Sequence, residues 1–196
     1  MANKTESSLV NMVLALGGIA LVASALLGFV YQITKEPIAL ANKKILENAI
    51  KVVSPSDLQD AQYGDKYMIA SDKDSLSCYP VMDADGKLVA TAISTYTKLG
   101  FSGRFDIMVG FKPDGTIINT AVLSHAETPG LGDKMDVKKS DWSVQFRDKN
   151  PKEFNLKVTK DGGEVDAITA ATISSRAFSD AATRAYDAYM KGGRHE

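Results

Sequence analysis

The stretch DAITAATIS, from Asp166 to Ser174, lies where a short extended segment gives way to the last helical pattern of the chain. Beyond it, apolar residues recur every three or four positions as far as Tyr189, which predicts a helix beginning near Thr172. Before it, Asp161 to Gly163 predicts a turn, and residues 164–168 are expected to be extended. The hydroxyl groups of this stretch therefore gather at a strand-to-helix junction.

A junction of this kind suits an anion. The first N–H groups of a helix lack partners within the helix and lie at the positive end of its dipole, so a phosphate carried by Thr172 needs no lysine there. Ordinary capping is the alternative, because Thr169, Thr172, Ser174 and Ser175 are all residue types favoured at an N-cap. The local pattern by itself favours capping.

The N-terminal region is strongly apolar. Residues 7–34 contain no Asp, Glu, Lys or Arg, and Leu9 to Ile33 is apolar with few exceptions. At about 1.5 Å per residue this run reaches roughly 37 Å, enough for a hydrocarbon core of about 30 Å. A cleaved signal peptide is the competing interpretation, but the run continues past Ala23 to Ala25. We therefore expect a retained membrane anchor.

The chain is accordingly divided into a short tail at residues 1–8, one transmembrane helix at 9–34 and one domain at 35–196. The length of the last segment suits a single compact core. A second helical pattern opens at Glu36-Pro37, with Pro37 expected in its first turn, and it ends before Ser54. Its apolar face predicts packing on the domain.

Charge and cysteine content exclude several classes of protein. The formal net charge is −1 and basic residues form no block, which argues against nucleic acid as a partner. The single cysteine, Cys78, excludes an internal disulfide, and no spacing suits zinc or an iron–sulfur cluster. Packing is the role expected for Cys78.

The middle of the chain predicts two β-hairpins. Tyr79 to Met82 pairs with Lys87 to Thr97, and Arg104 to Phe111 pairs with Thr116 to Ser124, each around an Asp-Gly turn. The connector at residues 98–103 holds two glycines and predicts a tight turn or a close approach to a ligand.

A short helix is expected from Asp136 to Phe146 and a further strand from Glu153 to Val158. The predicted fold class is α+β, an antiparallel sheet with flanking helices, preceded by one N-terminal transmembrane helix.

A second unusual loop, HAETPGLG, runs from His125 to Gly132. Its proline and glycines make it irregular and let backbone amides approach a ligand. His125 and Glu127 suggest an acid–base pair, but no Ser or Cys nearby occupies a nucleophile elbow, so a hydrolase lacks its nucleophile. Considered alone, the loop is better interpreted as a structured turn.

The two stretches together resemble a known pattern. The chain is similar to the FMN-binding subunits of the Rnf and Nqr respiratory complexes, and most closely to the family of Rnf G subunits. That family pairs an HxETPGLG loop with a later flavin-attachment motif ending in [ST]GAT, here DAITAAT from Asp166 to Thr172. The region GFSGRFDIMVGF and the closing helix fit in the same order. Ala170 replaces the usual glycine, which raises the question whether the backbone there needs a positive φ.

The resemblance implies that FMN is attached to Thr172 through a phosphoester made by a separate flavin transferase, which reads Asp166 as part of its signal. The neighbouring motif residues expected at the cofactor are Thr169, Ala171, Ile173 and Ser174. The HAETPGLG loop is expected to form one wall of the flavin ring site, through His125, Glu127, Thr128, Gly130, Leu131 and Gly132. A purely structural role for His125 is an equal alternative.

The implied role is electron relay within an Rnf-type ferredoxin:NAD⁺ oxidoreductase coupled to Na⁺ or H⁺ transport, without catalysis by this subunit alone. The partners implied are the other membrane subunits of the complex. The resemblance also implies a single-pass protein of the cell inner membrane with its domain on the periplasmic face. Alternatives are the C subunit of an Nqr-type NADH:quinone oxidoreductase, which is usually longer, and a non-catalytic anchored binding or assembly module.

Overall fold

The computed structural model describes residues 8–56, 61–71 and 74–193. Most of the expected tail at residues 1–8 lies outside these residues. The chain separates into two units, residues 1–44 and residues 45–196, and each is described by itself. The boundary expected after residue 34 stays a prediction.

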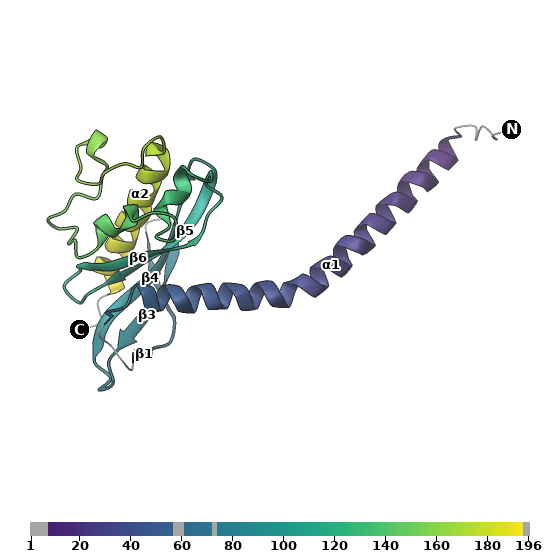
Figure 1. The fold of residues 1–196 in the computed structure, drawn as a ribbon. Coiled ribbons are helices and arrows are strands. Elements are labelled where there is room, and N and C mark those ends of the chain that lie inside the picture. Colours follow the sequence, from purple (N-terminus) through teal and green to yellow (C-terminus); the bar gives the residue numbers. More distant parts are fainter. Residues whose placement is uncertain (1–7, 57–60, 72–73, 194–196) are drawn as a thin grey trace. The chain divides into compact units, whose positions relative to one another are not determined.

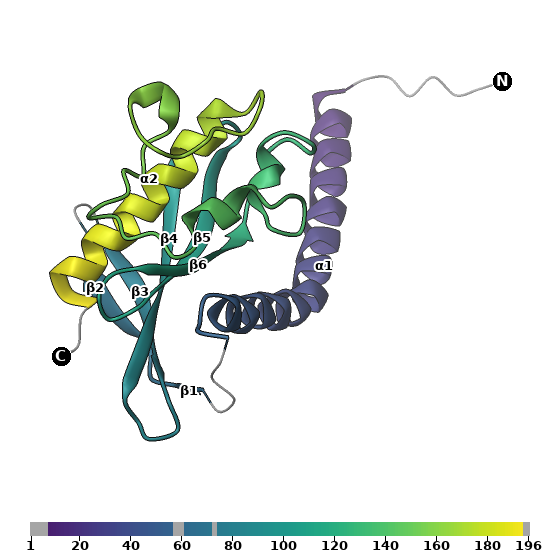
Figure 2. The same cartoon turned by 60° about the vertical axis from the view of Figure 1, so that its left-hand side comes forward.

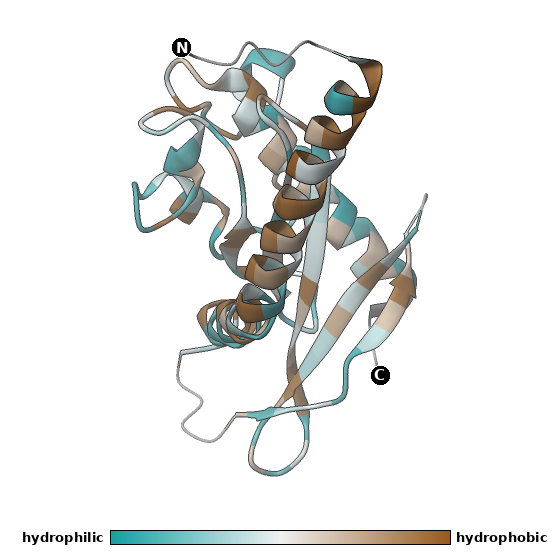
Figure 3. Cartoon of the chain, turned by 90° about the vertical axis from the view of Figure 1, so that its right-hand side faces the viewer, coloured by the Kyte–Doolittle hydropathy of each residue, from teal (hydrophilic) through white to brown (hydrophobic). Residues whose placement is uncertain are grey.

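Helix α1 runs without a break from Leu9 to Val52 (Figure 1). It is long and apolar enough to cross a membrane, and its apolar residues follow one another along the helix in Figure 3. The sequence placed Pro37 in the first turn of a second helix, but the residue lies inside α1. Proline removes one N–H and crowds the carbonyl four residues earlier, yet the helical patterns on both sides of it keep the helix continuous.

The domain is built on a six-stranded antiparallel sheet with the order β1-β3-β4-β5-β6, and β2 also pairs with β3. Its strands are β1 (Gln62–Tyr63), β2 (Tyr67–Ala70), β3 (Ser75–Met82), β4 (Leu88–Gly100), β5 (Gly103–Phe111) and β6 (Ile117–Ser124). Helix α2 (Thr172–Ala188) follows the sheet in sequence. The predicted α+β class and both predicted hairpins are confirmed. Strands β4 and β5 are longer than expected and form a hairpin of their own, with only two residues between them.

One face of the sheet packs against α2, which lies across β4 and β5 in Figure 2. Alternate residues of β5 point to this face, because side chains of a strand alternate between its two sides. Phe105, Ile107, Val109 and Phe111 are fully buried there, together with Ala177, Phe178, Ala181 and other residues of α2. The threonines of β4 also face α2, and Thr95 donates to the carbonyl of Ala181 at 3.2 Å.

The opposite face of the sheet packs against the C-terminal end of α1. We call this contact the α1 packing face; its buried residues are Ala49, Ile50, Val53, Val81, Ala90, Ala92 and Met108. The Nδ2 of Asn119 donates to the carbonyl of Val52 at 3.1 Å, and the Ser54 hydroxyl donates to the carbonyl of Ile50 at 2.6 Å. Gly110 lies beneath Val53, where a Cβ would overlap the Val53 carbonyl. The predicted packing of residues 36–53 on the domain is confirmed for this last part.

Two predicted elements were wrong. The helix expected from Asp136 to Phe146 reduces to the 3-10 helix η2 (Trp142–Phe146), because the apolar residues are too few to support a continuous helical face. Another 3-10 helix, η1 (Gly132–Met135), ends just before this segment. The strand expected from Glu153 to Val158 reduces to one parallel bridge between Val158 and Val165, followed by the 3-10 helix η3 (Thr159–Asp161). A π-helical turn, η4 (Tyr189–Gly193), follows α2.

Candidate functional site

Helix α2 begins at Thr172, as predicted, and its N-cap is Ala171, with φ −135° and ψ 44°. No side chain caps it. The hydroxyls turn elsewhere: Ser175 Oγ accepts the Ile168 N–H at 2.9 Å and donates to the Ala171 carbonyl at 3.0 Å. The capping interpretation of this hydroxyl cluster was therefore wrong. Within the described part of the chain, the N–H groups of residues 172–174 have no hydrogen-bond partner.

Ala170 answers the question raised by its place in the motif. Its φ is 62°, in the left-handed region, and among the described residues only Asp148 shares a positive φ without being glycine. An alanine there is destabilised by about 1–2 kcal/mol relative to right-handed geometry. A glycine at this position would avoid that cost. The left-handed residue also turns the chain sharply from the extended segment into α2.

A pocket of about 300 Å³ opens at this junction. Three segments form its wall: the β4–β5 turn, the HAETPGLG loop and the start of α2. We call it the α2 pocket; its lining residues are Phe101, Glu127, Thr128, Leu131, Gly132, Ala170, Ala171, Thr172, Ile173 and Ser174. Two sequence stretches that are some forty residues apart thus share one cavity. Most of the lining is apolar, and Thr172 is half-buried in it.

Glu127 joins the three segments. Its side chain is buried, with 4% of its surface exposed. Oε2 accepts the Ser174 hydroxyl at 2.5 Å, and Oε1 accepts the backbone N–H of Ser102 at 3.0 Å. The carboxylate therefore ties the loop both to α2 and to the β4–β5 turn.

Two glycines leave room for this carboxylate. A Cβ on Gly132 would lie 2.5 Å from Glu127 Oε2 and 2.6 Å from Ser174 Oγ, and a Cβ on Gly100 would lie 2.7 Å from Glu127 Oε1. Any side chain at either position would displace the hydrogen-bonded group. The glycines are thus required by the close approach of the protein's own Glu127 carboxylate, whereas the sequence pattern had suggested that they admit a ligand.

Other predicted residues lie around the pocket without lining it. His125 is half-buried, and its Nδ1 accepts the backbone N–H of Glu127 at 3.2 Å, so the imidazole meets the main chain of Glu127 and forms no hydrogen bond to its carboxylate. The acid–base pair suggested by the sequence is therefore absent. Gly130 is exposed with φ 79°, and its N–H donates to Asp133 Oδ1 at 2.7 Å. Thr169 is exposed.

Asp166 is held by its backbone. Its N–H donates to Gln145 Oε1 at 2.7 Å, and its carbonyl accepts the Trp142 indole N–H at 2.6 Å and the Gln145 amide at 3.3 Å. The residue itself is exposed. The 3-10 helix η2 thus fixes the start of the DAITAAT stretch on the domain surface.

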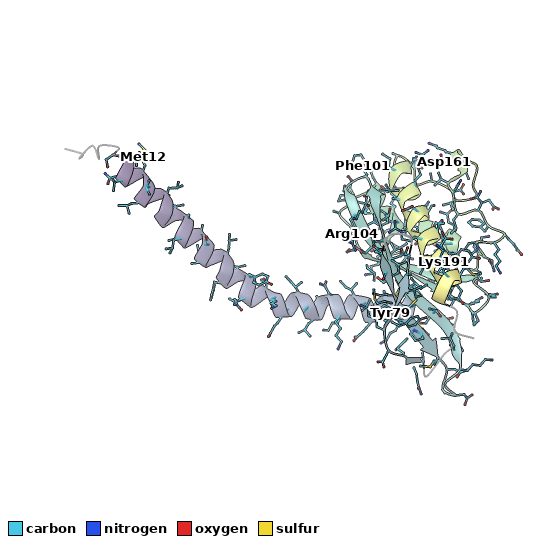
Figure 4. The ribbon with its side chains drawn as sticks, turned by 180° about the vertical axis from the view of Figure 1, so that it is seen from behind. Met12, Tyr79, Phe101, Arg104, Asp161 and Lys191 are labelled. Atoms are coloured by element: carbon cyan, nitrogen blue, oxygen red, sulfur yellow. The ribbon has the colours of Figure 1, made fainter. Side chains whose placement is uncertain are left out.

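Phe101 is the pocket residue that sequence reasoning missed. It is 68% exposed although it is aromatic, and it lies at the upper end of the domain in Figure 4, with Asp161 and far from Tyr79 and Lys191. Ile173 and Leu131, which also line the pocket, are 48% and 39% exposed. A phenylalanine between Gly100 and Ser102, at the tip of a hairpin, was the available signal.

Charge near the start of α2 is balanced outside the pocket. Arg176 makes two hydrogen bonds to Asp161, at 2.7 and 2.8 Å, and this pairing lowers the pKa of the Asp161 carboxyl. Of the described residues that line the pocket, only Glu127 has an ionisable side chain. Among the described residues, no cluster of His, Cys, Asp and Glu is suited to a metal ion.

Cys78 lies away from this site, buried in the core between the sheet and α2. Burial raises the pKa of its thiol to about 12, and burial also raises the pKa of the neighbouring Tyr67 hydroxyl. The thiol is therefore protonated at neutral pH and serves as a packing group.

Comparison with a family model agrees with this geometry. The model of the FMN-binding domain matches residues 100–187, a range that contains every residue of the α2 pocket. A crystal structure of NqrC from Shewanella oneidensis is 23% identical, covers 65% of this chain and 64% of its own, and has a TM-score of 0.45.

Relatives of similar length align with most of this chain. The G subunit of the ion-translocating oxidoreductase complex of Shewanella amazonensis is 33% identical over 187 residues, which are 91% of this chain and 87% of the relative. The G subunit of the same name from Vibrio atlanticus is 37% identical over 172 residues, 84% of this chain and 82% of the relative.

Proposed function

The chain belongs to the family of G subunits of ion-translocating oxidoreductase complexes, and on that premise we propose that it relays electrons through FMN attached covalently to Thr172. It is a subunit of an oxidoreductase complex with an FMN-binding domain. The proposal adds the attachment site, the position of the flavin and the reaction of the complex, which is ferredoxin:NAD⁺ oxidoreduction coupled to Na⁺ or H⁺ transport.

The observation that carries the proposal is the position of Thr172. Its hydroxyl-bearing side chain lies in the wall of the α2 pocket, and the free N–H groups of residues 172–174 lie at the same helix end. Helix N-termini with free amides bind phosphate groups, so a phosphate on Thr172 would be accepted there. The largely apolar pocket beside it suits a flat aromatic ring system. The residues therefore fit FMN.

Bound FMN supplies transfer of one or two electrons. The chain's own residues hold and shield it. Leu131, Ile173 and Phe101 offer apolar contact and exclude water, while Thr128 and Glu127 offer polar groups. His125 and Gly130 stabilise the loop through hydrogen bonds: His125 Nδ1 accepts the Glu127 N–H, and the Gly130 N–H donates to Asp133 Oδ1. Asp166, Thr169, Ala171, Ser174 and Gly132 shape the turn and the helix start on which the flavin is held.

Attachment calls for an external enzyme. A threonine hydroxyl is a weak nucleophile unless a base removes its proton. The carboxylate of Glu127, the one acid–base group in the pocket lining, is engaged by Ser174 and Ser102. We therefore propose that a flavin transferase supplies the base and reads the exposed Asp166 as part of its signal.

The long apolar helix and the family support a membrane-anchored subunit. We place the transmembrane segment at residues 9–34 and the FMN-binding domain at 35–196, on the periplasmic face of the cell inner membrane. The other membrane subunits of the complex are its partners. A tethered flavin has a clear advantage outside the cytosol, because it stays at high local concentration when a free one would be diluted.

The attachment is tested by producing the chain with its transferase, denaturing it and viewing the gel under ultraviolet light. A fluorescent wild-type band is expected, Thr172→Ala should be dark, and Thr172→Ser should retain fluorescence through its hydroxyl. Thr183→Ala is the matched control and should stay fluorescent, because Thr183 is a threonine of the same helix that lies outside the motif and does not line the α2 pocket. A dark wild-type band, or a fluorescent Thr172→Ala band, would contradict the proposal.

The orientation is tested separately. Alkaline phosphatase fused after Glu196 should be active in bacteria, because that enzyme matures only outside the cytosol, where its disulfides form. An inactive fusion of normal abundance would place the domain on the cytoplasmic side.

A further inference from the structure

The α2 pocket contains a buried carboxylate without a cation. Glu127 is 4% exposed, and the other nine lining residues carry no charge. Buried carboxylates in proteins are ordinarily paired with a cation or a metal. Within the described part of the chain, Glu127 forms no ion pair, and its recorded partners are a backbone N–H and a hydroxyl.

The arginines on the elements that meet at Glu127 engage other groups. They are Arg104 on β5 with Asp106, Arg176 on α2 with Asp161, and Arg184 on α2 over the ring of Tyr96. On the loop itself, His125 meets only the backbone N–H of Glu127. Among the described residues, no side-chain cation is therefore paired with Glu127, and its hydrogen-bond partners are neutral groups.

This arrangement is built around the carboxylate. Gly100 and Gly132 leave the two oxygens the space that a Cβ would fill. Ser102 and Ser174 then place one donor on each oxygen. The hydrogen bonds hold the group at the pocket wall and prevent it from turning out to solvent.

We propose that Glu127 lowers the reduction potential of a flavin bound in the α2 pocket, an inference that rests on the proposed function. Reduction of one flavin to its anionic reduced form takes two electrons from a donor and one proton from solvent, and it leaves one added negative charge on the ring. A fixed negative charge in a site of low dielectric constant opposes the arrival of each electron, and no cation in the pocket lining offsets it. Glu127 thereby makes the bound flavin a stronger reductant toward the next carrier.

The test is a reductive titration of the full-length, flavin-loaded protein in detergent, with the midpoint potential followed by absorbance. Glu127→Gln keeps the size of the side chain and its acceptor for Ser102 but removes the charge. We expect its reduction equilibrium to favour the reduced flavin about tenfold more than the wild type, a rise of about 30 mV for two electrons. Glu127→Asp withdraws the charge by one methylene and should give a smaller rise, which keeps the inference testable if the Gln variant does not fold.

The matched control is Asp133→Asn. Asp133 is a buried carboxylate, 7% exposed, that follows the same loop but does not line the pocket. Asparagine keeps the acceptor for the Gly130 N–H, so the fold is preserved while one buried charge is lost. Its midpoint potential should differ from the wild-type value by less than a third of the shift seen in Glu127→Gln.

The possible outcomes distinguish a failure of the proposed function from a failure of the role proposed for Glu127. A flavin that is not on Thr172 refutes the proposed function through the gel, before any potential is measured. A correctly attached flavin whose potential is unchanged or falls in Glu127→Gln, or in Glu127→Asp if only that variant folds, refutes the role of Glu127. An equal rise in Asp133→Asn also refutes it, because general charge would then explain the effect.

Discussion

The α1 packing face and the α2 pocket both contain a helix end, apolar side chains and glycines, but these groups have different roles in the two regions. At the α1 packing face, the last carbonyls of α1 are capped by Asn119 and Ser54, and the apolar side chains are buried. At the α2 pocket, three helix amides lack partners within the described part of the chain, and Phe101 is exposed. In the first region the helix carbonyls have hydrogen-bond donors, whereas in the second the three N–H groups are available to a ligand or to solvent.

Glycine shows the difference most clearly. Gly110 lets two backbones touch, because the carbonyl of Val53 occupies the place of its absent Cβ. Gly100 and Gly132 instead admit a polar group, the Glu127 carboxylate, to the edge of a cavity. The same lack of a side chain therefore serves close packing in one region and a polar wall in the other.

The largest effect is expected at the α1 packing face. Gly110→Ala places a methyl group on the Val53 carbonyl, and backbone cannot move aside as a side chain does, so the domain should lose about 3 kcal/mol of unfolding free energy. Urea unfolding of the full-length chain in detergent measures this, with the fluorescence of its single tryptophan, Trp142, as the probe. That residue is half-buried against Phe146 and Phe178.

Gly86→Ala is the control, since no atom lies within 4 Å of the added Cβ. Its φ of 78° alone should cost about 1 kcal/mol. Equal losses in the two variants would mean that close packing at Val53 contributes nothing beyond backbone conformation.

A smaller effect is expected at the pocket wall. Ser174→Ala removes the hydroxyl that Glu127 Oε2 accepts, leaving a buried oxygen without its donor. The penalty for such an unsatisfied group is about 1–3 kcal/mol, and the better helix propensity of alanine offsets about 0.5 kcal/mol of it. We expect a net loss of about 1–2 kcal/mol in the same unfolding experiment.

Ser179 offers a matched control on the same helix. It is also buried, but its hydroxyl has no hydrogen-bond partner within the described part of the chain. Ser179→Ala should therefore be neutral or slightly stabilising. If both serine variants behave alike, the hydrogen bond to Glu127 is not a stabilising feature of the pocket.

Sequence periodicity located most of the fold. The hairpins and the start of α2 followed from alternating and helical patterns, each of which reports burial of one face. The elements between Asp136 and Val165 were misjudged because 3-10 turns and a single bridge leave no sustained period. The two short strands β1 and β2 lie in a region where no pattern was recognised, and strands this short carry too few residues to show one.

The site was only partly accessible from sequence. The two motifs named residues that line one pocket, among them Glu127, Leu131 and Thr172, but the resemblance to a family brought them together. Phe101 was missed because the β4–β5 turn approaches the loop only in the folded sheet. The choice between capping and ligand binding depended on which way Ser174 and Ser175 turn, and a sequence does not specify that.

The smallest effect on stability is expected at Ala170, which lines the α2 pocket and has a positive φ. Ala170→Gly removes the strain of a left-handed alanine, which costs the folded state about 1–2 kcal/mol. Glycine also gives the unfolded chain more conformational entropy, which costs about 0.5–1 kcal/mol of stability. The free energy of unfolding should therefore rise by roughly 0.5–1 kcal/mol. Ala126→Gly is the control, because Ala126 has no positive φ, and it should lose stability through entropy alone. Opposite signs in urea unfolding would show that the junction stores strain beside the helix end. If both variants lose stability, Ala170 adopts its left-handed conformation without strain. The α2 pocket would then differ from the α1 packing face in its polar groups alone.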